Sequence, residues 1–209
     1  GSNSSCSGCT DPMADNYDPD ATIDDGSCDY PFDPCASLQI FENAGVSSVS
    51  KSGDAVYVLG TFEGNLALGG TELNSSDGGD VFIAKLSECD VEWAVHLSGG
   101  SVSSGDLVVD HNSDILFAGT YHSSMTLYHT SGDETIPHDQ GGDGYIVKMD
   151  SNGEHIWNTT LRGGSNEGMG SIAIDYNNNV YISGVFNGCC PSYMNATLHS
   201  SNGSSYTLY

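Results

Sequence analysis

The sequence predicts an all-β protein in which short antiparallel strands recur as repeats of about 60 residues. Three observations lead to this prediction. Glycine and tyrosine are abundant, at 27 and 11 of 209 residues, which favours strands joined by turns. Hydrophobic residues make up 37% of the chain, enough for a core. Finally, several short segments of β type occur two or three times along the sequence.

The repeated segments all lie after residue 36 and are spaced 59 to 65 residues apart. Each repeat is expected to contain four strands, named A to D in chain order. Strand C follows Gly-Gly-Asp in the first two repeats, and strand D carries Trp93 or Trp157. The matching segments are DAVYVLGTF (54–62) with DILFAGTY (114–121) and NVYISGVF (179–186), GGDVFIAKL (78–86) with GGDGYIVKM (141–149), and VEWAVHLSGGS (91–101) with HIWNTTLRGGS (155–165).

The turns between these strands have recognisable chemistry. The segments DHNSD (110–114) and DYNNN (175–179) join strand A to strand B, and DSNGE (150–154) joins strand C to strand D. Asp and Asn tolerate left-handed backbone and bond their own main chain, so they favour such turns. Four antiparallel strands in about 60 residues are typical of one β-propeller blade. Because Trp93 and Trp157 share one position in the repeat, as do Lys85 and Lys148, we expect these four residues to serve packing between blades.

These residues resemble the extracellular β-propeller repeat family of bacterial and archaeal secreted proteins, whose units contain G-G-D-x-F-I-A-K-L and N-V-Y-V-S-G. The resemblance covers roughly residues 37–209. It implies propeller-type four-stranded repeats, about 2.5 to 3 of them, and an exposed location, but no particular activity. The expected domains are residues 1–36 and 37–209, with repeats at approximately 46–100, 101–165 and 166–209.

The third repeat departs from this pattern in its B–C loop, where Cys189 and Cys190 are adjacent. We expect them to pin this loop, together with Cys89. Residues 204–209 correspond to the middle of strand C, so strand D is missing, whereas residues 37–45 occupy the place of a strand D before the first repeat. Residues 37–42 could complete the third repeat of the same molecule, or they could pair with the open edge of the next molecule. The third alternative is that the chain is a piece of a longer protein.

The N-terminal segment has six aspartates and no lysine or arginine between Cys9 and Cys28. It resembles a short acidic disulfide module of secreted surface proteins and, more loosely, the calcium loops of thrombospondin type 3 repeats. The resemblance implies a Cys9–Cys28 disulfide, a possible second bridge between Cys6 and Cys35, and bound Ca²⁺ that offsets the negative charge. Ordinary Asp-Pro and Asp-Gly turns are the alternative. The expected calcium ligands are Asp11, Asn16, Asp18, Asp20, Asp24 and Asp25.

Charge and cysteine usage predict an extracellular or cell-surface protein. The chain has 28 acidic against 4 basic residues, a net charge of -24, which disfavours nucleic acid and anionic membranes as partners. Seven cysteines indicate an oxidising compartment. A zinc site at Cys6 and Cys9 is disfavoured because no paired histidines follow. Candidate N-glycosylation sites are Asn3, Asn74, Asn158, Asn195 and Asn202.

Enzymatic motifs are absent from the sequence, which has no G-x-S-x-G, no H-E-x-x-H and no phosphate-binding glycine loop. Three sets of residues remain as alternatives, for a transition metal, for paired carboxylates and for a ligand-binding face. These sets are His122, His129 and His138; Glu63, Asp106 and Glu167; and Tyr121, Tyr128, Tyr193 and Trp157.

The expected function is therefore a secreted, calcium-dependent, non-enzymatic scaffold or filament subunit. Strand complementation would join the copies head to tail into a homopolymer. An adhesin or propeller that binds carbohydrate or a surface protein is the alternative, and an extracellular hydrolase is a third.

Overall fold

The computed structural model describes residues 6–29, 43–75, 78–88, 90–163, 166–186, 196–200 and 205–208. Every regular element in these residues is a β-strand, which confirms the predicted all-β class. No helix in this part of the chain is long and apolar enough to cross a membrane. The chain forms two compact units, Gly1–Ile40 and Phe41–Tyr209.

The N-terminal unit is held by a disulfide and two very short strands. Strands β1 (Ser7–Gly8) and β2 (Ile23–Asp24) pair in parallel. Cys9 is buried and forms a disulfide with Cys28, which confirms the expected bridge. This bond removes Cys9 from any zinc site, whereas Cys6 is exposed and has a free thiol. Its expected partner, Cys35, lies outside the described residues.

The second unit contains two six-stranded antiparallel sheets. Sheet I has the order β12-β11-β8-β7-β4-β3, and sheet II has the order β18-β17-β14-β13-β10-β9. Four strands of each sheet are the predicted strands A to D in their predicted order. These strands are β3 (Ala44–Ser52), β4 (Ala55–Phe62), β7 (Asp80–Ser87) and β8 (Asp90–Ser98) in sheet I, and β9 (Val102–Val109), β10 (Ile115–Tyr121), β13 (Asp143–Met149) and β14 (His155–Arg162) in sheet II.

The other two strands of each sheet come from the B–C hairpin of the following repeat. Hairpin β11 (Met125–His129) with β12 (Gly132–Ile136) pairs with β8. Hairpin β17 (Ala196–Ser200) with β18 (Ser205–Leu208) pairs with β14. The expectation that residues 204–209 lie in the middle of strand C of the third repeat is therefore wrong for residues 205–208, whereas residues 37–42, the expected extra strand D, lie outside the described residues. Residues 205–208 instead form the second strand of a hairpin, whose first strand pairs with the edge of β14.

Two smaller sheets complete the repeats. The B–C hairpin of the first repeat, β5 (Asn65–Leu68) with β6 (Thr71–Asn74), forms a two-stranded sheet of its own. Strands A and B of the third repeat, β15 (Glu167–Ile174) and β16 (Val180–Phe186), form another. Within the described residues, the outer edge of β16 and the outer edge of β5 therefore carry no paired strand.

Three hydrophobic clusters hold these sheets together. The largest joins sheets I and II, with Tyr57 and Leu59 from β4 against Leu107 and Phe117 from sheet II. A second cluster packs the β5–β6 hairpin on the opposite face of sheet I. The third packs the β15–β16 sheet against sheet II. The residues of the second cluster include Leu66, Leu68, Leu73, Phe62 and Phe82.

The two tryptophans lie between successive repeats, as their shared position predicts. Trp93 packs against the cluster between sheets I and II, and its Nε1 donates a hydrogen bond of 3.2 Å to the carbonyl of Ser151 in the next repeat. Trp157 packs against the cluster beside β15–β16. Both side chains therefore fill the space between neighbouring sheets.

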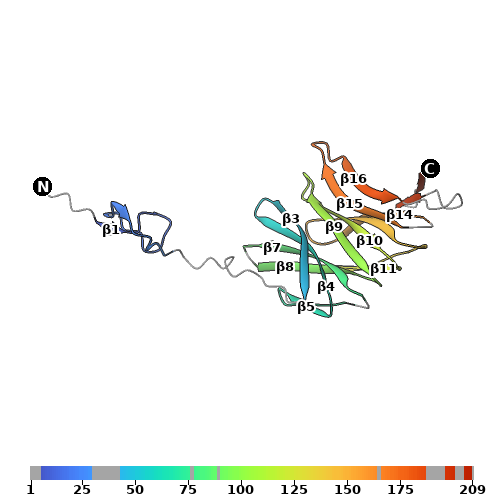
Figure 1. The fold of residues 1–209 in the computed structure, drawn as a ribbon, viewed down its shortest axis with the longest axis horizontal. Helices are drawn as coiled ribbons and strands as arrows, with labels where there is room; N and C mark the ends of the chain where they lie inside the picture. Colours follow the sequence, from blue (N-terminus) through green and yellow to red (C-terminus); the bar gives the residue numbers. More distant parts are fainter. Residues whose placement is uncertain are drawn as a thin grey trace. The chain divides into compact units, whose positions relative to one another are not determined.

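The A strands of the three repeats follow one another across the molecule. Figure 1 shows β3, β9 and β15 in succession. Side-chain hydrogen bonds connect them. The Ser47 and Ser104 hydroxyls are 2.6 Å apart, and Ser48 donates to Asp106 at 3.0 Å. The second carboxylate oxygen of Asp106 accepts from the backbone of Ile172 at 3.1 Å. Asp106 therefore links all three A strands.

Candidate functional site

The aspartates of the N-terminal unit form a series of tight turns. In four of them the carboxylate accepts a hydrogen bond from the backbone N–H two residues later, which is the Asx-turn arrangement. Asn16 instead bridges the module, because its side chain bonds the backbone of both Ser27 and Asp29. The four turns are Asp11 to Met13 at 2.9 Å, Asp18 to Asp20 at 2.9 Å, Asp24 to Gly26 at 3.0 Å and Asp25 to Ser27 at 3.0 Å.

In these turns the aspartate carboxylates accept hydrogen bonds from backbone N–H groups, which stabilise their negative charge. Hydrogen bonds from Ser27 and then Ser7 keep the pKa of Asp25 below its ordinary value. Among the described residues, no three His, Cys, Asp or Glu side chains are grouped so as to hold a metal ion. Calcium binding by the module stays a prediction of the sequence. Amide exchange of residues 8–28 with and without a chelator tests it, and exchange that is unchanged in excess chelator would contradict it.

The A–B and C–D turns of the later repeats use the same aspartate chemistry. In the turns at 110–114, 150–154 and 175–179, the first aspartate accepts from the amides two and four residues later, at 2.8 to 3.0 Å. The fourth residue of each turn has a left-handed backbone, with φ of 66° at Ser113, 82° at Gly153 and 61° at Asn178. The predicted turn chemistry is therefore present in the structure.

Lys85 and Lys148 occupy one repeat position but take different partners. Lys85 lies 2.6 Å from Glu92 on strand D. Lys148 lies 2.8 Å from Asp110 and 2.9 Å from Asp114, at the A–B turn. Burial opposes the charge on Lys148 and on Asp110, but their hydrogen bonds outweigh it. The pKa of Lys148 is therefore raised and that of Asp110 is lowered.

The Gly-Gly-Asp motif places a buried aspartate at the start of strand C. Asp80 accepts from the backbone of Gly99 at 3.4 Å, so it ties strand C to the turn after strand D. Asp143, its equivalent, accepts from the backbone of Asp139 at 3.0 Å. Burial raises the pKa of Asp143. A buried carboxylate next to a histidine can mark a reactive site, so its surroundings decide its role.

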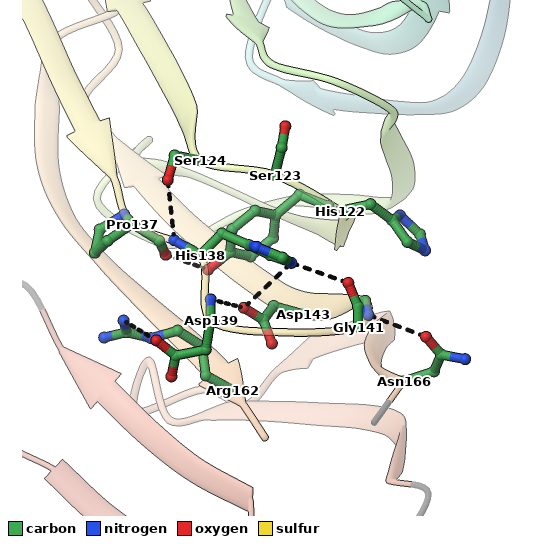
Figure 2. A network of polar contacts seen from close by, with 12 residues as sticks. His122, Ser123, Ser124, Pro137, His138, Asp139, Gly141, Asp143, Arg162 and Asn166 are labelled. Carbon is green, nitrogen blue, oxygen red and sulfur yellow. Dashed lines mark hydrogen bonds and ion pairs between the residues drawn. The ribbon is translucent and has the colours of Figure 1, made fainter. Parts of the chain in front are cut away.

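Figure 2 shows these surroundings. His138 Nε2 lies 2.9 Å from the carbonyl of Gly141 and 4.0 Å from the Asp143 carboxylate. Asp139 pairs with Arg162 at 3.6 Å, and the backbone of Gly142 donates to Asn166 at 3.0 Å. Most of these bonds run to backbone groups between residues 137 and 143. The network therefore holds the segment before β13 in place.

The alternative metal site at the histidines is not supported by the described residues. His122 points away from His138 in Figure 2 and lies 3.4 Å from the carbonyl of Ser101. His129 packs beside His155 instead, with ring centroids 6.0 Å apart. The three histidines therefore face different surroundings, in line with the absence of a metal-type cluster in this part of the chain.

The three candidate carboxylates lie in different parts of the fold. Asp106 links the A strands, and Glu167 is buried at the start of β15. Glu63 is one of the residues that line a pocket of about 660 Å³ near the ends of strands β3, β4, β7 and β9. The pocket is lined by Asn43, Gly45, Thr61, Phe62, Glu63, Gly64, Gly78, Gly79 and Val102.

The aromatic candidates are mostly part of the packing. Tyr121 is buried and donates to the carbonyl of Pro137 at 2.8 Å. Tyr128 stacks on His96, with ring centroids 4.6 Å apart. Tyr193 lies outside the described residues. The sequence reasoning missed Tyr176, which is 89% exposed and lies beside His111. Their places in equivalent A–B turns were the signal that could have identified the pair.

Two repeat positions that are buried between sheets I and II are exposed where they recur on the outer faces of the repeats. We call these the Val49 face, on sheet I, and the Tyr181 face, on the β15–β16 sheet. Val49 lies opposite Val58 on β4 as Leu107 lies opposite Phe117 on β10. Leu107 is 3% exposed against sheet I, but Val49 is 58% exposed. At the other end, Tyr181 stands three residues before the repeated glycine, as Tyr57 does in the first repeat. Tyr57 is 1% exposed and Tyr181 is 58% exposed.

Only part of the predicted modification chemistry falls in the described residues. Asn74, at the end of β6, is exposed and accessible to glycosylation. Asn158 is 6% exposed within β14, which leaves little room for a glycan. The remaining candidates lie outside the described residues: Asn3, Asn195, Asn202, Cys89, Cys189 and Cys190.

Comparison of the chain with known protein families, with curated proteins and with solved structures found no match.

Proposed function

We propose that this chain is an extracellular, non-enzymatic structural protein whose propeller-type repeats associate head to tail with further copies. The main support is a difference in solvent exposure between side chains at the same repeat position, which are buried between the two sheets but exposed on the outer faces. Leu107 and Tyr57 are buried between sheets I and II, whereas Val49 and Tyr181 are exposed. Large apolar side chains exposed in this way favour contact with another surface.

The two outer faces repeat the two opposite sides of the interface between sheets I and II, which favours a head-to-tail contact. Tyr57 and Leu107 belong to one cluster, with Tyr57 from the earlier repeat and Leu107 from the later repeat. Tyr181 repeats the position of Tyr57, and Val49 repeats that of Leu107. The Tyr181 face of one copy would therefore meet the Val49 face of the next, which is a heterologous contact that can extend into a filament.

Backbone pairing would add to this contact. In sheets I and II a hairpin of the following repeat pairs with strand D of the preceding repeat. The β5–β6 hairpin holds the same place in the first repeat, and no described strand pairs with its β5 edge. Pairing of an exposed edge with another chain is an established route to assembly.

The remaining features fit an extracellular structural role. The Cys9–Cys28 disulfide suits an oxidising compartment. The carboxylates Asp80, Asp106 and Asp143 bond backbone amides, which gives each a structural task. The net charge of -24 keeps nucleic acid away.

Sedimentation velocity across a range of protein concentrations tests the proposal. We expect a series of growing species that the Tyr181→Asp and Val49→Asp variants each abolish, because a charge at either face would be buried without a partner. A single monomeric species at every concentration would contradict the proposal, and so would polymers that persist in both variants.

A further inference from the structure

The A–B turns of the second and third repeats bring an aromatic pair to the surface. His111 lies in the turn at 110–114 and Tyr176 in the turn at 175–179. Their ring centroids are 5.5 Å apart and their planes are inclined by 56°. Tyr176 is 89% exposed, and His111 is also exposed. An aromatic ring this exposed has apolar surface that a ligand could bury.

The two turns are fixed relative to each other, so the pair is preorganised. The backbone of His111 donates a hydrogen bond of 3.1 Å to Oδ1 of Asn178. Asp175 holds its own turn by accepting from the backbone of Asn177 at 2.8 Å and of Asn179 at 2.9 Å. A surface that is already ordered binds with a smaller entropic cost than one that must order on contact.

Each ring of the pair is followed in the sequence by an exposed asparagine. Asn112 directly follows His111 in one turn, Asn177 directly follows Tyr176 in the other, and both asparagines are exposed. Tyrosine combined with asparagine provides a rigid apolar contact together with adaptable hydrogen bonding. A pyranose ring has matching chemistry, since its C–H face stacks on an aromatic ring and its hydroxyls bond amides.

We propose that the surface formed by His111, Asn112, Tyr176 and Asn177 binds neutral glycans. Tyr176 supplies the stacking face, His111 bounds it on one side, and the two asparagines bond the sugar hydroxyls. The net charge of -24 disfavours anionic sugars, which makes the neutral class the preferred one. This surface does not include Val49 or Tyr181, but the Tyr181 hydroxyl donates a hydrogen bond of 3.1 Å to Asp175 in the turn that carries Tyr176, so the test of glycan binding leaves Tyr181 unaltered.

Saturation-transfer difference NMR on the full chain tests this site, because it detects weak sugar binding to monomers and polymers alike. The probes are cellotriose, maltotriose and mannotriose, with trigalacturonic acid as the anionic comparison. We expect signal from the ring C–H protons of at least one neutral trisaccharide and little from trigalacturonic acid. Tyr176→Ala should reduce the signal at least fivefold, and Tyr176→Phe should retain most of it.

Tyr128→Ala is the matched control, because Tyr128 is a partly exposed tyrosine in sheet I, outside the A–B turns, and its removal should leave the signal unchanged. Unchanged melting of Tyr176→Ala would show that the variant is folded. The proposal is wrong if none of the three neutral trisaccharides gives a signal, which would leave the exposed pair for a protein partner. It is also wrong if Tyr176→Ala binds as well as the unaltered chain, or if trigalacturonic acid binds equally well.

Discussion

The interface between sheets I and II and the two outer faces of the repeats use the same sequence positions in different surroundings. Inside, Leu107 and Tyr57 are almost fully buried. Outside, Val49 and Tyr181 are more than half exposed at the corresponding places. The difference shows that the repeat pattern specifies which side chains face a neighbour, whereas burial depends on whether a neighbour is present.

The largest expected effect compares Leu107→Ala with Val49→Ala. We expect Leu107→Ala to lower the free energy of unfolding by about 2–5 kcal/mol, because it leaves a cavity between the two sheets. Val49→Ala should cost less than about 1 kcal/mol in the monomer, because its side chain is already exposed. Urea denaturation at a protein concentration that keeps the chain monomeric measures both. An equal decrease in the free energy of unfolding of the two variants would contradict the difference in burial between Leu107 and Val49.

A smaller effect separates the two lysines that share a repeat position. Lys148→Met should cost about 1–2 kcal/mol, because it leaves the buried Asp110 carboxylate without its charged partner. Lys85→Met should lower the free energy of unfolding by less than Lys148→Met does, because its partner Glu92 is solvent-exposed.

The effect of Lys148 should also depend on pH. The folded-state pKa of Asp110 is lowered, so the stability that this pair adds is present at neutral pH. That stability is lost as the pH falls through the depressed pKa of Asp110. Chemical denaturation at neutral and acidic pH should therefore show the Lys148→Met difference shrinking in acid. A difference that grows in acid would contradict the assigned pair.

The smallest effect compares two residues with left-handed backbone in equivalent A–B turns. Ser113→Gly should stabilise the protein by up to about 1 kcal/mol, because the relief of positive φ outweighs the loss of the long 3.4 Å contact between the Ser113 and Ser52 hydroxyls. Asn178→Gly should give no such gain, because Asn178 tolerates this conformation and also accepts a hydrogen bond from His111. Thermal melting of the two variants measures the contrast, and a larger gain in Asn178→Gly would show that the turns are not equivalent.

Much of the fold was predictable because it depends on local patterns. The strands of the first two repeats follow their apolar segments and aspartate turns, and the Cys9–Cys28 bridge follows the resemblance of the N-terminal module. The lateral pairing of each B–C hairpin with the preceding strand D was not predictable. It is a contact between distant edges, and residues 205–208 have the same apolar alternation whether they form strand C or a hairpin.

The candidate sites were less predictable than the fold. The sequence marked His122, His129 and His138 as neighbours in one loop region, yet the alternation of side chains along strands and turns sends them in different directions. Conversely, His111 and Tyr176 lie 65 positions apart and meet only because equivalent turns of successive repeats are adjacent. Such a pair becomes visible in the sequence only after the repeats are superimposed.

Cysteine cross-linking between two singly substituted chains tests the head-to-tail contact most directly. One chain would carry Val49→Cys and the other Tyr181→Cys, and peptide mass spectrometry would identify the disulfide after mild oxidation. Head-to-tail association predicts a bridge between residues 49 and 181 in the mixture that neither variant forms alone between its own copies. Bridges only between like positions, or no bridge from either position, would contradict it.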